Sequence, residues 1–168
     1  MPRIIIVDRT LQEDTWETLP RDAALPDSGN VIAPLETWRH VRESARARSG
    51  AVGVWLAPDD DPAGIAPDVE RLPVIAVQFP QFADGRGYST ARLLRARHGF
   101  RGQLRAFGEV LRDQLFYLER VGFNAFALKE GRNVADALAA FADFSEAYQA
   151  SALAPEPPYR RRTTAAGA

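Results

Sequence analysis

The 168-residue chain, with 46% hydrophobic and 26% charged residues, has room for one well-buried domain and is too short for two of ordinary size. Its formal net charge of -1 provides no global field toward nucleic acid or an anionic membrane, so any anion recognition must be local. The lack of cysteine excludes disulfides, thiol redox chemistry and cysteine-ligated iron-sulfur clusters within this chain.

Residues 1–30 are predicted to form an N-terminal arm. The run from Ile4 to Val7 predicts a short strand. Prolines, a glycine and polar residues over 11–30 predict a loop with at most one brief strand at 15–18. Because the apolar run is far too short for a signal peptide or a membrane span, we expect a cytoplasmic protein with no membrane partner.

Residues 31–150 are predicted to form a single α/β domain of repeated βα units. Short apolar runs alternate with helical stretches, and they lie at 31–33, 51–57, 74–79, 103–107 and 125–128. Their spacing favours parallel strands with crossover helices, which gives a mostly parallel sheet flanked by helices. An open doubly wound sheet is favoured, and an incomplete βα barrel is the alternative. In both, ligands bind beyond the carboxyl ends of the strands.

Helices and a tail complete this prediction. Leu111, Leu115 and Leu118 form the apolar stripe of a helix over 109–121, and a shorter helix is predicted over 64–71. The last helix begins near an Asn133 cap. Residues 151–168 are rich in proline and arginine, and they are predicted to be a mobile tail.

The segment 84–89 (DGRGYS) lies where the strand at 74–79 passes to the next helix. Glycine N–H groups, a hydroxyl and nearby guanidinium groups at such a junction can hold an oxyanion. The alternative is an ordinary glycine-bearing turn whose side chains cap the backbone while the arginines face solvent. The candidate anion-binding residues here are Asp84, Gly85, Arg86, Gly87, Ser89 and Arg92.

Two further cations are candidates for the same site. Arg105 lies within a predicted buried strand, where it needs a carboxylate partner such as Asp113 or Asp84, or else faces an anionic ligand. Lys129 follows the last strand at the same end of the sheet, and Asp113 and Gln114 are supporting residues. We expect the 84–89 segment and Arg105 to converge in one concavity. No metal is expected, because the two histidines lack ligand-like spacing.

The region 31–149 resembles a bacterial family of unknown-function proteins labelled "oxidoreductase probably involved in sulfite reduction". The resemblance is most specific in the segments 79–89 (FPQFADGRGYS), 91–95 (ARLLR), 102–108 (GQLRAFG), 112–114 (RDQ) and 122–126 (GFNAF). Members are typically encoded beside assimilatory sulfite reductase and other sulfate-assimilation genes. The resemblance implies a role in making sulfide for cysteine biosynthesis, with sulfite reductase or its electron donor as the partner.

The chain contains no evident catalytic or redox-cofactor motif. Reduction of sulfite to sulfide takes several electrons carried by cofactors that this chain has no cysteine to ligate. The expected function is therefore that of an accessory protein, which docks on the reductase or its donor or binds a sulfur oxyanion at the carboxyl ends of the strands. The alternative is a self-sufficient small-molecule oxidoreductase, with flavin as a possible cofactor, that uses the same end of the sheet.

Overall fold

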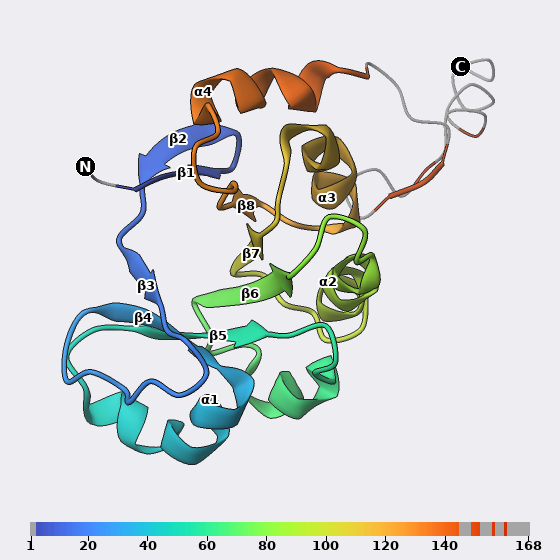
Figure 1. Ribbon diagram of the computed structural model, residues 1–168. Helices are drawn as coiled ribbons and strands as arrows, with labels where there is room; N and C mark the ends of the chain where they lie inside the picture. The colour runs from blue at the N-terminus through green and yellow to red at the C-terminus, as the bar shows by residue number, and fades with distance from the viewer. Residues whose placement is uncertain (1–2, 145–148, 152–155, 157–159, 161–168) are drawn as a thin grey trace, which may run out of the picture.

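A mixed, curled sheet organises the part of the chain that the structure describes, which comprises residues 3–144, 149–151, 156 and 160 of a computed structural model. In these residues eight strands follow the order β2-β1-β8-β7-β6-β5-β4-β3 (Figure 1). The strands are β1 (Ile4–Val7), β2 (Thr10–Glu13), β3 (Trp16–Thr18), β4 (Asn30–Pro34), β5 (Val52–Leu56), β6 (Val74–Phe79), β7 (Gln103–Gly108) and β8 (Ala125–Phe126). The protein is an α/β protein whose sheet has the form of a half-barrel.

Each adjacent pair of strands from β3 to β8 is parallel, whereas β8 pairs antiparallel with β1 on its other side. The pair β6 and β7 runs in register from Val74 with Gln103 to Phe79 with Gly108. The five predicted apolar runs correspond to β4, β5, β6, β7 and β8, so the repeated βα interpretation is confirmed. Near-continuous apolar sequences suit these strands because both faces of the sheet are covered.

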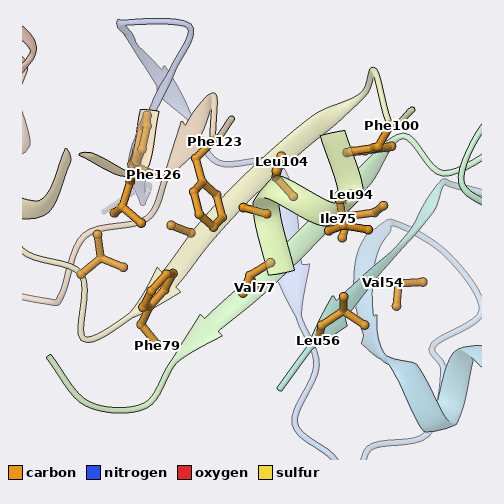
Figure 2. Packing of buried hydrophobic residues seen from close by; sticks show 14 of the residues in the cluster. Val54, Leu56, Ile75, Val77, Phe79, Leu94, Phe100, Leu104, Phe123 and Phe126 are labelled. Carbon is orange, nitrogen blue, oxygen red and sulfur yellow. The ribbon is translucent and has the colours of Figure 1, made fainter. Parts of the chain in front are cut away.

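Side chains alternate between two faces of this sheet. On β7, Leu104 and Ala106 belong to the large core under the helices, whereas Phe107 packs with Trp55 and Ala76 on the concave face. Figure 2 shows the helix-covered core, with labelled residues Val54, Leu56, Ile75, Val77, Phe79, Leu94, Phe100, Leu104, Phe123 and Phe126. Arg105, which lies between Leu104 and Ala106, therefore faces the concave side.

The N-terminal segment contributes more to the sheet than its sequence predicted. Strand β1 was predicted, and β3 lies within the predicted 15–18 interval. Strand β2 was not predicted, and this is a correction: its four residues are all exposed, so they carry no apolar signal. It pairs antiparallel with β1 through a turn in which Asp8 and Arg9 have φ of 47° and 59°.

The two edge strands of the sheet, β2 and β3, are adjacent in the chain. Only Asp14 and Thr15 separate them, yet they stand at opposite ends of the strand order. Three peptide steps span at most about 11 Å, so the sheet must curl until its edges approach each other. This link is visible in Figure 1 as the blue segment that joins β2 to β3.

Helices cover the convex face, mainly on one side of the sheet (Figure 1). They are α1 (Leu35–Val41), α2 (Arg86–Ala96), α3 (Leu115–Val121) and α4 (Val134–Ala137), with short 3-10 helices η1 (Ser44–Ala47), η2 (Pro62–Asp68), η3 (Arg112–Gln114) and η4 (Leu138–Ala142). The Asn133 cap is confirmed, since its Oδ1 accepts from the N–H groups of Ala135 and Asp136 at 3.0 and 3.1 Å.

Two helix boundaries differ from the prediction. The helix expected over 109–121 begins at Arg112, because the N–H of Glu109 still pairs with the carbonyl of Phe79 at 2.7 Å. The helix expected over 64–71 is the 3-10 helix η2, capped by Asp61. The predicted tail, 151–168, lies outside the described residues except at three positions.

Candidate functional site

The two glycines of the 84–89 segment have different structural roles. Helix α2 begins at Arg86, inside this segment, so Gly85 is its N-cap and Gly87 lies in its first turn. A Cβ on Gly87 would approach the Phe79 ring to 2.6 Å, whereas a Cβ on Gly85 would meet nothing within 4 Å. Close packing against Phe79 thus explains Gly87.

Arg86 is held by carboxylates of the protein itself. Asp84 accepts hydrogen bonds from its backbone N–H at 3.2 Å, from Nε at 3.0 Å and from Nη2 at 2.7 Å. Its Nη1 pairs with Asp59. Hydrogen bonding to Arg86 lowers the pKa of Asp84, and the same contact raises the pKa of Arg86. An oxyanion at this point would compete with two carboxylates.

We expect Arg86→Ala to leave the thermal midpoint essentially unchanged, because exposed ion pairs contribute little to stability. Binding of sulfite, sulfate and phosphate to the variant should match binding to the wild type in calorimetric titrations. Loss of anion binding in the Arg86 variant alone would instead identify the 84–89 segment as an anion site.

Arg105 is buried on the concave face and pairs with Asp14. Its Nη1 lies 3.0 Å from Asp14 Oδ1, and the two side chains are 1% and 0% exposed. Asp14 Oδ2 also accepts a hydrogen bond from Nε of Arg3 at 2.8 Å. With its amide in the hydrogen-bonding orientation, Gln103 accepts from Arg105 Nη2 and Nε at 2.9 and 3.0 Å. Burial lowers the pKa of Arg105, and the Asp14 charge opposes that shift.

This arrangement corrects two predictions. The partner of Arg105 is Asp14, 91 residues away, and neither Asp113 nor Asp84. Ser89 lies on α2, which packs through Ala91 and Leu94 on the opposite, helix-covered face. Arg105 points away from α2, because its neighbours Leu104 and Ala106 face the helices and adjacent residues of a strand point to opposite faces. The predicted convergence of Arg105 with the 84–89 segment is therefore wrong.

Two other predicted residues at the carboxyl ends of the strands, Lys129 and Gln114, are engaged with neighbouring groups of the protein. Lys129 Nζ lies 2.6 Å from Glu109 Oε2. Gln114 accepts the N–H of Leu111 at 2.9 Å, and so secures the start of η3. Burial raises the pKa of Tyr88, and the negative charge of Asp113 adds to this effect.

Arg92, one of the predicted residues, lines a pocket with a volume of about 660 Å³. This pocket lies at the amino ends of β7 and β8, opposite to the predicted end of the sheet, since it includes residues 100–101 and 122–124. Four arginines line it, namely Arg9, Arg92, Arg95 and Arg101, together with the carboxylates Asp8 and Glu119.

Arg95 connects two of the chain segments that line this pocket. Its guanidinium donates to the carbonyl oxygens of Gly122 at 2.8 Å, Phe100 at 2.8 Å and Gly102 at 3.0 Å, and to Asn124 Oδ1 at 3.1 Å. All four acceptors are neutral. Burial lowers the pKa of Arg95, and the positive charge of Arg101 lowers it further. The role of Arg95 was not predicted, because its acceptors are mostly backbone groups that leave no sequence signal.

The charges around the pocket are only partly compensated. Arg9 forms a two-point ion pair with Glu119 at 2.7 and 2.8 Å, and Asp8 accepts from the Asn124 amide at 3.1 Å. Within the described ranges, Arg92 and Arg101 have no hydrogen-bond or ion-pair partner. Two guanidinium groups thus remain available to an anionic group, which arginine can bind with two parallel hydrogen bonds.

Neither a cluster of metal ligands nor a membrane-spanning helix is found in the described residues. None of their His, Asp and Glu side chains form a group of three or more that is placed to hold a metal ion. Among the helices of this part of the chain, none has the length and apolar character needed to cross a membrane.

The fold and the site define an α/β protein with a curled mixed sheet and an arginine-lined pocket at one end of it. A family model described as "Bacterial protein of unknown function (DUF934)" matches residues 53–159, and the chain belongs to this family. The match contains Arg92, Arg95 and Arg101 but not Asp14. No curated protein matched the chain.

Proposed function

We propose that the protein is a cytoplasmic accessory protein of bacterial assimilatory sulfite reduction, which binds an anionic group at the pocket lined by Arg92, Arg95 and Arg101. The anionic group belongs to a sulfur oxyanion or to an acidic surface of sulfite reductase or its electron donor. The observation that carries this proposal is the pair of unpartnered guanidinium groups, Arg92 and Arg101, on one pocket of the described structure. The resemblance of the 79–126 region supplies the pathway.

The pocket is a better candidate than the predicted site at the carboxyl ends of the strands. There, Arg86 and Lys129 are already paired with Asp84, Asp59 and Glu109. A ligand anion would have to displace these carboxylates, whereas Arg92 and Arg101 are paired with no carboxylate of the described residues. An unpaired arginine is therefore the stronger indication of an anion site.

The accessory role follows from composition. The chain has no cysteine, so it cannot hold the iron-sulfur cluster through which sulfite reduction would proceed.

We also take the curled sheet to be an incomplete βα barrel. Strands β3 to β8 follow one another in sequence order, without the reversal of order that creates the binding crevice of a doubly wound sheet.

The second candidate function is a self-sufficient oxidoreductase that binds flavin or another organic anion. It is favoured by the pocket volume of about 660 Å³, which is within the range of small-molecule sites and larger than a sulfite ion needs. A flavin-like visible spectrum of the purified protein would favour this candidate over the accessory role.

Deletion of the gene is expected to impair bacterial growth on sulfate or sulfite, while sulfide or cysteine restores growth, because the proposed role precedes sulfide. A strain with one copy of the gene is required. The wild-type gene should complement the deletion, and a variant with Arg92→Glu and Arg101→Glu should not. Arg46→Glu, which alters an exposed arginine on η1, is the control. Equal growth of the deletion strain on all four sulfur sources would refute the proposal.

A further inference from the structure

The arginine-lined pocket adjoins a second pocket of about 600 Å³. Both are lined by Arg92, Val121, Ala150 and Ser151, so they lie side by side along α2 and α3, and we term the two together the α2–α3 groove. Its first half contains Arg92 and Arg101. Its second half contains Tyr117, Arg120 and Phe144.

The second half of the groove is aromatic. The rings of Phe116 and Phe144 lie 4.9 Å apart, and those of Phe116 and Tyr117 lie 5.4 Å apart. Arg120 lies over the Phe116 ring at 5.7 Å. Tyr117 and Phe144 are each 54% exposed. A cluster of exposed aromatic side chains rimmed by polar groups is typical of an interaction surface.

The first half of the groove is cationic. Its carboxylates are engaged, Glu119 by Arg9 and Asp8 by the Asn124 amide. Arg92 and Arg101 have no such partner in the part of the chain described. A ligand that fills both halves must therefore present negative charge at one end and an apolar group at the other.

We infer that the α2–α3 groove docks an acidic segment of a second protein that carries a large apolar side chain beside its carboxylates. Arginine and exposed aromatic residues are the side chains most enriched at the energetic centres of protein interfaces. A free sulfur oxyanion would use the arginines and leave the aromatic half without a role. The inference deepens the accessory role proposed above and rests on it for the biological setting of the partner.

The test is a selection of random displayed peptides against the full-length protein, followed by fluorescence anisotropy with the most enriched peptides. We expect these peptides to combine aspartate or glutamate with a large apolar residue and to bind more weakly as salt is added. Arg92→Ala and Tyr117→Ala should each weaken binding by about tenfold, which corresponds to about 1.4 kcal/mol.

Two variants away from the groove are matched controls. Arg46→Ala removes an exposed arginine on η1, and Phe82→Ala removes a 52% exposed aromatic ring that does not line the groove. Both should retain wild-type affinity. Failure to enrich any peptide, enrichment of neutral or basic peptides, or intact binding in Tyr117→Ala would each overturn the inference.

The peptide and growth experiments separate the two proposals. Peptide binding that depends on the groove, together with normal growth of the deletion strain, would retain the docking surface and refute the role in sulfite reduction. A growth defect without peptide binding would support the role in sulfite reduction and refute the docking surface.

Discussion

Asp14→Ala is expected to lower the free energy of unfolding by about 3 to 5 kcal/mol, the range for removing one partner of a buried ion pair. The loss strands the guanidinium of Arg105, whose side chain is 1% exposed. It also removes an acceptor from Arg3 and from the N–H of Trp16. Urea denaturation followed by circular dichroism measures the effect.

Two variants show whether the stranded charge is the cause. The double variant Asp14→Leu with Arg105→Met should recover much of the loss, because apolar residues of similar volume often replace a buried pair at little cost. Asp143→Ala breaks an exposed pair with Arg112 and should cost at most about 1 kcal/mol. A loss in Asp14→Ala no larger than in Asp143→Ala would contradict the structural role of the buried pair.

Gly87→Ala is expected to destabilise the protein by about 1 to 3 kcal/mol, the usual cost of forcing extra atoms into a packed core. The added Cβ would approach Cζ of Phe79 to 2.6 Å, and Phe79 is fully buried and unable to move away freely. Thermal or urea unfolding measures the loss. Gly85→Ala is the matched control, and it should stay within about 1 kcal/mol of wild type because its Cβ enters open space.

A double-mutant cycle identifies the contact. If the Phe79 ring is responsible, Gly87→Ala should cost less in a Phe79→Leu background than in the wild type. Equal costs in both backgrounds would assign the effect of Gly87→Ala to the helix backbone. Anion titration of Gly87→Ala further separates packing from ligand binding, since a packing role predicts unchanged anion affinity in the folded variant.

The parallel strands were predictable because burial on both faces leaves a continuous apolar run, as in residues 74–79. Strand β2 was not predictable by this signal, because all four of its residues are exposed and it forms by pairing with β1. Two alternatives followed from the strand position of Arg105, a carboxylate partner or an anionic ligand, and the structure shows the carboxylate. The identity of this partner was not predictable, because the pairing with Asp14 depends on how the sheet curls.

The candidate site was also predictable only in part. Arg92 was predicted among the anion-binding residues, but it lies with Arg101 at the amino ends of β7 and β8. The prediction favoured the opposite end because parallel sheets usually bind ligands beyond the carboxyl ends of their strands. Arg101 has no local sequence feature that distinguishes it from a solvated arginine, and only its lack of an ion-pair partner among the described residues marks it.

The short link of Asp14 and Thr15 also bears on aggregation. Strands β2 and β3 cover the outer sides of β1 and β4, whose sequences IIIV and NVIAP are strongly apolar. Uncovered apolar strands readily pair with other chains. Because one continuous segment of the chain covers both strands, its detachment in a single local opening would uncover both at once. The ion pair between Asp14 and Arg105 attaches this segment to β7. It therefore opposes the opening that would let two molecules associate through the edges of their sheets.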